Sequence, residues 1–413
     1  MTINNSILSI LQSRGLIAQK SHEKKVQEKI LLVPFYFYLG FDPTSDSLHI
    51  GSLVPLMTMA NLSMLGCKPV CLIGDGTALI GDPSGKTEMR KMLSSETISN
   101  NCELIKKQIV NIFPHLPITF VNNASWFNNI KYLDFLRDIG PVFRVNEMIK
   151  AESYKERLKR EDGLSFLEFN YQLLQAYDYL YLHDKYKCVL QIGGDDQWSN
   201  MIAGIDLIRK KRGQDVLVIT TPLLTTASGK KMGKTESGAI WLDPEKTSPY
   251  DFYQYWINTD DRDIARFLKI FTFLDIAEIE NMISINNDPR EIKKILAFEV
   301  TKIVHGEKKA IIAKETTDKL FEHRHTESVP DNMPNIKIDN IAYLCSENKI
   351  DVIELIVKAK IINSKTKVRS LIEGGGIYIN NIKINDHLIT LNNNQKFILI
   401  RIGKKKYYKI LIS

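Results

Sequence analysis

The sequence lacks the features of a membrane, secreted or zinc-binding protein. Its 413 residues contain no run of about 18 consecutive apolar residues, so no membrane-spanning helix is predicted. The N-terminal MTINNSILSI has neither the basic-then-apolar pattern nor the small-residue cleavage site of an export signal. The five cysteines form no CxxC pair, which argues against a disulfide framework and a zinc site. We therefore expect a cytoplasmic protein that holds no metal through its own side chains.

An excess of positive charge is also absent over most of the chain. Lys and Arg number 55 against 48 Asp and Glu, a net charge of +7. From residue 330 onward there are 14 basic and 7 acidic side chains, and the residues before it hold 41 of each. The whole excess therefore lies in the last fifth of the chain, where a polyanion such as RNA would be attracted.

The order of apolar segments predicts an α/β fold. Five short apolar runs, separated by helical stretches, read as buried strands: LLVPFYFYL at 31–39, then KPVCLIG, PITFVN, KCVLQIG and DVLVITTPLL. Strands that alternate with helices indicate a parallel sheet with helices on both faces. We assign this sheet to residues 1–225, a polar loop and helices to 226–325, a linker to 326–347 and a small α+β domain to 348–413.

A helix start after the first strand suggests a phosphate site. YLGFDPT (38–44) leads to LHIGS (48–52), and an apolar helix is predicted over 51–65. Unpaired N–H groups and the positive end of the helix dipole favour phosphate there, beside His49. The alternative is a capped helix with an incidental histidine.

Two further patterns carry polar groups suited to a nucleotide and a small substrate. The loop GKKMGKTESG (229–238) could place Lys231 and Lys234 on a polyphosphate, although a lysine-rich loop is usually just solvated. Tyr171, Gln175 and Asp178 are spaced i, i+4 and i+7, so on a helix they project from one face. A solvent-exposed face is the alternative interpretation of that spacing.

At this point the chain resembles a known family. HIGS at 49–52 and KMGKT at 231–235 are similar to the HIGH and KMSKS motifs of class I aminoacyl-tRNA synthetases. More specifically, YLGFDPTSDSLHIGS, LIGDPSGK, YQLLQAYD, QIGGDDQW and KMGKTESGAIWLDPEKTSPYDFYQYWIN resemble bacterial tyrosyl-tRNA synthetases, from about residue 30 to the C-terminus. The resemblance implies a Rossmann-like doubly wound parallel sheet, then an α-helical anticodon-arm domain and an S4-like RNA-binding domain. It also implies tyrosine activation by ATP with Mg²⁺, transfer to tRNA(Tyr), and a homodimer formed through an insertion at about 120–160, chiefly the stretch from Trp126 to Met148.

The resemblance also implies roles for individual residues. Those expected to bind tyrosine are Tyr38 and Asp178 at the phenol, Asp82, Tyr171 and Gln175 at the ammonium group, and Gln197 near the carboxylate. Those expected to bind ATP are Gly40, Asp42, His49, Gly51, Ser52, Gly194, Asp196 and Lys234, with Gly193 allowing a close approach. Those expected to stabilise the pyrophosphate in the transition state are Thr44, His49, Lys86, Arg90, Lys231, Lys234 and Thr235. Those expected to bind RNA are Lys365, Lys367, Arg369, Lys404, Lys405 and Lys406, the last three beside the possible stacking surfaces Tyr407 and Tyr408.

Three positions depart from the family pattern, and three other functions remain open. Ser52 stands where His or Asn is common, Leu39 where Cys is frequent, and Asp195 where Ser is usual. We expect weaker ATP binding with intact chemistry; an ATP Michaelis constant that fails to improve in Ser52→His would contradict this. The alternatives are a tryptophanyl-type synthetase, a small nucleotidylyltransferase, which would lack the lysine loop and C-terminal extensions, and a synthetase-derived RNA-binding or splicing protein.

Overall fold

The protein divides into two compact units. The structure is a computed structural model that describes residues 7–23, 27, 31–84, 93–161, 163–229, 232–235, 238–285, 288–322, 335–338, 345–346, 349–380, 382–390, 397–403 and 406–411. The first unit comprises residues 1–232, 241–243 and 260–292, and the second comprises 233–240, 244–259 and 293–413. No helix in the described ranges combines the length and apolarity needed to span a membrane.

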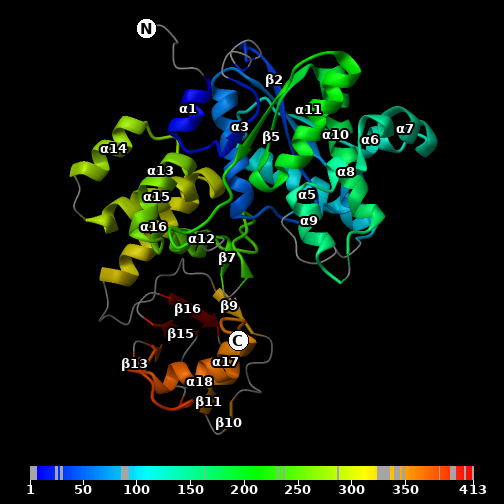
Figure 1. The fold of residues 1–413 in the computed structure, drawn as a ribbon. Coiled ribbons are helices and arrows are strands. Elements are labelled where there is room, and N and C mark those ends of the chain that lie inside the picture. Colours follow the sequence, from blue (N-terminus) through cyan, green and yellow to red (C-terminus); the bar gives the residue numbers. More distant parts are fainter. Residues whose placement is uncertain are drawn as a thin grey trace. The chain divides into compact units, whose positions relative to one another are not determined.

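A six-stranded sheet forms the centre of the first unit (Figure 1). In spatial order its strands are β1 (Gln19–Lys20), β6 (Leu217–Thr221), β5 (Cys188–Gly194), β2 (Tyr36–Phe41), β3 (Lys68–Ile73) and β4 (Thr119–Asn122). Every neighbouring pair is parallel except β1 with β6. The chain proceeds outward from β2 on one side and from β5 on the other, and ligands bind such sheets in the crevice beyond the carboxyl ends of these two strands.

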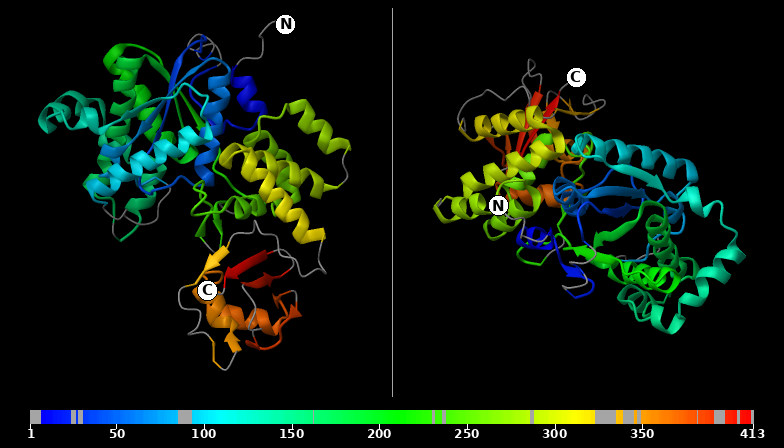
Figure 2. Two further views of the ribbon diagram at one scale, coloured as in Figure 1. Left: turned by 180° about the vertical axis from the view of Figure 1, so that it is seen from behind. Right: turned by 90° about the horizontal axis from the view of Figure 1, so that it is seen from above.

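Helices cover both faces of this sheet (Figures 1 and 2). α10 and α11 pack on one face, where Tyr38, Tyr179 and Met201 share a buried core, and α3 packs on the other. Among the described residues, the helices of this unit are α1 (Ile7–Ser13), α3 (Ile50–Met64), α4 (Asp75–Ala78), α5 (Ser95–Ile112), α6 (Ala124–Phe127), α7 (Tyr132–Ile139), α8 (Val145–Met148), α9 (Glu152–Leu158), α10 (Phe166–Tyr186), α11 (Trp198–Arg212), α13 (Ile264–Phe271) and α14 (Ile276–Ile285). The 3-10 turns are η1 (Gly140–Val142), η2 (Asp195–Gln197) and η3 (Asp261–Asp263).

The described part of the second unit contains a hairpin, three helices and a small α+β domain. The hairpin is β7 (Lys234–Thr235) with β8 (Gly238–Ala239), and the helices are α12 (Pro249–Ile257), α15 (Pro289–His305), whose first residues belong to the first unit, and α16 (Glu307–Glu322). In the small domain, α17 (Val352–Lys358) and α18 (Lys365–Glu373) accompany two sheets. One sheet is β13 (Ile382–Lys383), β12 (Ile377–Ile379), β15 (Phe397–Ile402), β16 (Lys406–Leu411) and β9 (Asn335–Lys337), and the other is β10 (Cys345–Ser346), β11 (Lys349–Asp351) and β14 (Leu388–Thr390).

The fold class predicted from the sequence is confirmed, with two local differences. The run 31–39 was expected to be one strand, but β2 begins at Tyr36 because Pro34 has no N–H to give to a ladder. The segment 326–347 was expected to be a linker, yet β9 pairs in parallel with β16 through Ile336 and Ile410. The predicted domain boundaries themselves stay predictions.

Candidate functional site

Polar residues follow β2 and β5 at the point where the strand order reverses. β2 ends at Phe41 and is followed by Asp42, and β5 ends at Gly194 and is followed by η2. A Cβ on Gly40 of β2 would be in ordinary van der Waals contact with the Leu72 side chain, 3.7 Å away. The carboxylates of Asp42, Asp195 and Asp196 therefore follow the ends of β2 and β5 at this edge of the sheet.

His49 is the N-cap of α3. Its Nδ1 accepts a hydrogen bond of 3.0 Å from the Gly51 N–H, so the neutral ring carries its proton on Nε2. A Cβ at position 51 would lie 2.8 Å from the His49 ring, which explains the need for glycine. Ser52 donates its backbone N–H to the His49 carbonyl at 2.8 Å. The histidine thus caps the helix, and its exposed ring lies at the positive end of the helix dipole.

Asp178 is a buried carboxylate held by two side-chain donors. Trp126 Nε1 donates to Oδ1 at 2.9 Å, and Asn123 Nδ2 donates to Oδ2 at 3.1 Å. Burial raises the pKa of Asp178 well above its usual range, whereas these two hydrogen bonds act to lower it. A buried acceptor in this position is suited to a neutral hydroxyl donor such as a phenol.

Tyr38 interacts electrostatically with Asp178 and has an unsatisfied hydroxyl. Its side chain is only 1 % exposed, and its oxygen has no hydrogen-bond partner among the described residues. Burial, and secondly the charge of Asp178, raise the pKa of Tyr38 well above its usual range, so the hydroxyl stays protonated. A buried polar group without a partner costs stability, and in a functional site it indicates a position where a ligand completes the bond.

The polar residues of α10 point inward, so the solvent-face interpretation of their spacing is wrong. Tyr171 is 6 % exposed and donates its hydroxyl to Asp42 Oδ2 at 2.9 Å. Thr77 donates to the other oxygen of Asp42 at 2.8 Å. The Oε1 atom of Gln175 is buried and has no partner within the described part of the chain. The helix therefore presents an unpaired amide oxygen as well as the Asp178 carboxylate.

The loop after β5 contacts the loop after β3. Gln197 Nε2 donates to Asp82 Oδ2 at 2.7 Å, and Asp82 Oδ1 accepts from the Ser84 N–H at 2.9 Å. A Cβ on Gly194 would lie 2.6 Å from Asp196 Oδ1, so a side chain there would displace the Asp196 carboxylate. Asp196, the second residue of η2, is exposed. The structure thus joins two residues that sequence reasoning assigned to the same substrate.

Several other predicted residues are not placed with this group. Lys86, Arg90, Lys231, Lys404 and Lys405 lie outside the described residues. Of the remaining lysine-loop residues, Lys234 and Thr235 form β7 in the second unit, and Lys406 begins β16; their side chains are not described.

The other predicted RNA contacts lie on or near α18. Lys365, Lys367 and Arg369 are all exposed on that helix, and Lys365 is hydrogen-bonded to Glu354. Tyr407 is buried against Tyr250 and Leu399, so it offers no stacking surface in this structure.

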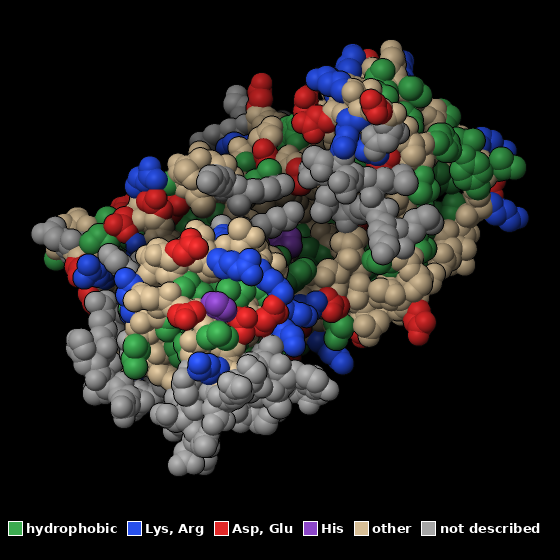
Figure 3. Space-filling model, turned by 90° about the horizontal axis from the view of Figure 1, so that it is seen from below, with side chains coloured by type: hydrophobic (Ala, Val, Ile, Leu, Met, Phe, Trp, Pro, Cys, Tyr) green, Lys and Arg blue, Asp and Glu red, His purple; other side chains and the backbone are tan. Residues whose placement is uncertain are grey.

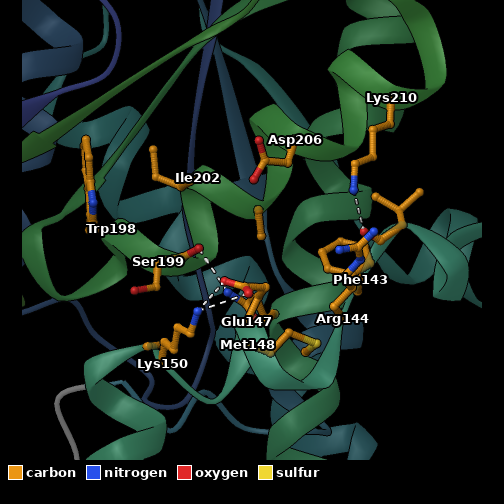
Figure 4. Close-up of a pocket in the computed structure, with 14 residues that line it drawn as sticks. Phe143, Arg144, Glu147, Met148, Lys150, Trp198, Ser199, Ile202, Asp206 and Lys210 are labelled. Carbon is orange, nitrogen blue, oxygen red and sulfur yellow. Dashed lines mark hydrogen bonds and ion pairs between the residues drawn. The ribbon is translucent and has the colours of Figure 1, made fainter.

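A cavity of about 560 Å³ lies elsewhere in the first unit, between α8, α10 and α11 (Figure 4). None of the predicted site residues lines it. Lys210 Nζ donates to the Val142 carbonyl at 2.9 Å, and Lys150 pairs with Glu147 at 2.9 Å, so these two cations at its rim are engaged with protein groups. The cavity is therefore distinct from the site formed around Asp178.

Sequence reasoning missed two residues that shape the site. Asn123 donates to both Asp178 and Thr77, and it accepts from the Gly76 N–H at 2.8 Å. Trp126 is only 5 % exposed and belongs to this network, although the sequence suggested it as part of a subunit interface. The available signal was their position directly after β4, at the same edge of the parallel sheet as the predicted residues.

Comparison with known proteins shows the family to which the chain belongs. The family model "tRNA synthetases class I (W and Y)" matches residues 32–322, and the chain belongs to that class of enzymes. The model "Tyrosine--tRNA ligase SYY-like C-terminal domain" matches residues 326–410. The tyrosine--tRNA ligase of Acetivibrio thermocellus is 47 % identical over 98 % of this chain and 99 % of its own, and that of Caldanaerobacter subterraneus subsp. tengcongensis is 46 % identical over 99 % and 100 %. Within the class, the chain is therefore a member of the tyrosine--tRNA ligase family.

Solved structures show the same relationship. The C-terminally truncated mitochondrial tyrosyl-tRNA synthetase of Aspergillus nidulans superposes with a TM-score of 0.70 at 30 % identity, over 77 % of this chain and 95 % of that one. The corresponding protein of Coccidioides posadasii gives 0.67 at 31 % identity, over 76 % and 92 %.

Proposed function

We propose that this tyrosyl-tRNA synthetase binds the phenol of tyrosine between Tyr38 and Asp178. The observation that carries the proposal is the buried, protonated Tyr38 hydroxyl, which has no partner among the described residues and interacts electrostatically with the buried Asp178 carboxylate. Tyr38 donates to the phenolic oxygen, and the phenol donates to Asp178. Phenylalanine would leave both groups unpaired. Tyrosyl-tRNA synthetases as a family discriminate against phenylalanine by about 10⁵-fold.

Activation then proceeds by direct attack. The tyrosine carboxylate attacks the α-phosphorus of ATP, which enters with Mg²⁺, and the products are tyrosyl-adenylate and pyrophosphate. The ammonium group is held by Asp82, Tyr171 and the free Gln175 oxygen. His49 Nε2, at the positive end of α3, donates to the departing phosphates. Lys86, Arg90, Lys231, Lys234, Thr44 and Thr235 supply further donors. Each well-placed donor is worth roughly 2.7 to 4 kcal/mol in the transition state.

The test of this step is amino-acid-dependent exchange of labelled pyrophosphate into ATP, with all twenty amino acids. Exchange only with tyrosine is expected. The same assay on Asp178→Ala should lose exchange, because removing the acceptor leaves the bound phenol unpaired. Exchange with tryptophan in preference to tyrosine would refute the assignment.

The second step needs tRNA(Tyr), and the basic C-terminal domain is proposed to hold it. Arg369 is exposed on α18, and the lysines at 365, 367 and 404–406 share its domain. Arg369→Glu should lower the kcat/KM of tyrosylation while pyrophosphate exchange in the same preparation stays at the wild-type rate. Equal losses in both assays would show that the substitution acts on the catalytic site.

A homodimer in the cytoplasm is the proposed working form. Four apolar side chains on α7 and α8 are at least 46 % exposed: Tyr132, Leu133, Leu136 and Val145. Hydrophobic side chains gather at that end of the molecule in Figure 3, and an exposed apolar patch is typical of an interface. Sedimentation equilibrium should give twice the chain mass of 47.3 kDa, and Leu133→Asp should give the monomer mass. Leu104→Asp, on the exposed face of α5, is the matched control and should stay dimeric.

A further inference from the structure

Asp195 is the centre of a closed ring of hydrogen bonds in the first unit. Its Oδ1 accepts from Thr220 Oγ1 at 2.7 Å and from Gln19 Nε2 at 2.8 Å. Thr220 Oγ1 in turn accepts from the Gln19 backbone N–H at 3.0 Å. Each of the three residues therefore contacts the other two, although Gln19 is 176 positions from Asp195 in the chain.

The ring attaches a very short edge strand to the sheet. β1 has only two residues and pairs antiparallel with β6, with Gln19 opposite Thr220. On either side, the Ala18 N–H donates to the Thr220 carbonyl at 2.8 Å and the Ser21 N–H donates to the Val218 carbonyl at 3.0 Å. The N-terminal segment is thus fastened to β6 along its length, and Asp195 extends this attachment to the loop beyond β5.

That loop carries two of the proposed substrate contacts. Asp195 is the first residue of η2, and Asp196 and Gln197 are the second and third. The residue before the turn, Gly194, provides no side-chain cap. Gln197 is held at its far end by Asp82. The bonds to Asp195 therefore fix the beginning of a turn whose end is already fixed.

The way Asp195 is held also matters for a polyanionic substrate. Its neighbour Asp196 is a second carboxylate, and both stand in a loop assigned to ATP. The two donors on Oδ1 turn the Asp195 carboxylate toward β1 and β6. The ring needs only an oxygen at position 195 that accepts the bonds from Thr220 and Gln19. The neutral amide oxygen of an asparagine can therefore replace the carboxylate oxygen.

We propose that Asp195, Thr220 and Gln19 are positioning residues that brace the start of η2, so that the N-terminal segment holds Asp196 in place for ATP, whereas Gln197 stays held by Asp82. The inference rests on the proposed function, since the contact of Asp196 with the ribose is part of it. The predicted signature is a rise in the Michaelis constant for ATP, with that for tyrosine unchanged.

The experiment measures pyrophosphate exchange by the full chain and by five single variants and one double variant. Asp195→Ala, Gln19→Ala and Thr220→Val each remove ring bonds and should raise the ATP Michaelis constant about tenfold, the usual effect of losing a hydrogen bond to a carboxylate. Asp195→Asn keeps an accepting oxygen and should stay within about twofold of wild type. Lys20→Ala, an exposed neighbour of Gln19 on β1, is the matched control. In the double variant Gln19→Ala with Asp195→Ala, the ATP Michaelis constant should rise no more than in Asp195→Ala alone.

The outcomes separate this inference from the proposed function. If the unmodified chain shows no tyrosine-dependent exchange, the proposed function fails. If it shows exchange but the ring variants keep the wild-type ATP Michaelis constant, the positioning role of Asp195, Thr220 and Gln19 is refuted. The same holds if these variants lose only thermal stability and kcat. If Asp195→Asn is as impaired as Asp195→Ala, the residue acts through its charge and the positioning role is refuted. If the effects of Gln19→Ala and Asp195→Ala on the ATP Michaelis constant add in the double variant, Gln19 and Asp195 act separately and the proposed shared role is refuted.

Discussion

Replacing Tyr38 by Phe should change stability and substrate binding in opposite directions. The side chain is 1 % exposed, and Phe differs from Tyr only by the hydroxyl, so the change opens almost no cavity. In the free protein that hydroxyl has no partner among the described residues, and its burial costs about 1 to 3 kcal/mol. Removing it should therefore stabilise the free protein.

The same change removes a bond that the proposed site forms with substrate. A neutral hydrogen bond contributes about 0.5 to 1.5 kcal/mol, which corresponds to a rise of about two- to twelvefold in the Michaelis constant for tyrosine. The constant for ATP should not change. Discrimination against phenylalanine should fall, because one of the two groups that phenylalanine leaves unpaired is gone.

Tyr179→Phe is the matched control. The centroids of the Tyr179 and Tyr38 rings are 5.1 Å apart, and both side chains are buried. The Tyr179 hydroxyl, however, donates to the Leu217 carbonyl at 2.7 Å. Thermal denaturation of the free proteins should show a higher midpoint for Tyr38→Phe, by about 1 to 2 °C for each kcal/mol in a chain of this size, and a lower one for Tyr179→Phe. If Tyr38→Phe lowers the midpoint and leaves the tyrosine Michaelis constant at its wild-type value, the hydroxyl is bonded within the protein and the reasoning is wrong.

Three further predictions follow from individual contacts. Trp126→Phe removes the 2.9 Å bond to Asp178 and should raise the Michaelis constant for tyrosine about tenfold in the exchange assay; an equal change for ATP would contradict this. Arg157→Met leaves the buried Glu168 carboxylate without the 3.1 Å ion pair and should lower the free energy of unfolding by about 3 to 5 kcal/mol in urea, whereas Arg157→Met with Glu168→Leu should recover part of that loss. Burial lowers the pKa of His305 from 6.5 to about 4, so the unfolded chain binds more protons between these values, and stability that is complete above pH 6.5 should be lost as the pH falls toward 4. His305→Leu should remove this dependence from thermal midpoints measured between pH 4 and 7, and an unchanged slope would rule it out.

Local pattern was sufficient for the sheet and for part of the site. Apolar runs that alternate with helices specify parallel pairing, and the observed β2, β3, β4, β5 and β6 correspond to the five predicted runs. The helix predicted over 51–65 is α3, and His49 stands at its start. The i, i+4, i+7 spacing placed Tyr171 and Asp178 on one helix, and both are buried. These features follow from residues close together in the chain.

Contacts between distant segments were not predictable in this way. Trp126 and Asn123 reach Asp178 across 52 and 55 positions, and nothing in the periodicity around α6 indicates which carboxylate they meet. The pairing of β9 with β16 was missed because a three-residue strand between polar stretches resembles a linker. Such contacts depend on the order of the strands in the sheet, which the local sequence pattern does not predict.

Tyr38 shows why the two kinds of information are complementary. In the sequence it lies within an apolar run, so a core tyrosine and a substrate-binding tyrosine fit the pattern equally well. Its burial does not separate them, because Tyr179 is just as buried and serves only the core. The difference lies in the bonds of each hydroxyl: that of Tyr179 donates to the Leu217 carbonyl, whereas that of Tyr38 has no acceptor among the described residues and interacts electrostatically with Asp178. Since buried hydroxyls in folded proteins are nearly always paired, the unpaired hydroxyl supports the proposal that Tyr38 finds its partner in the substrate.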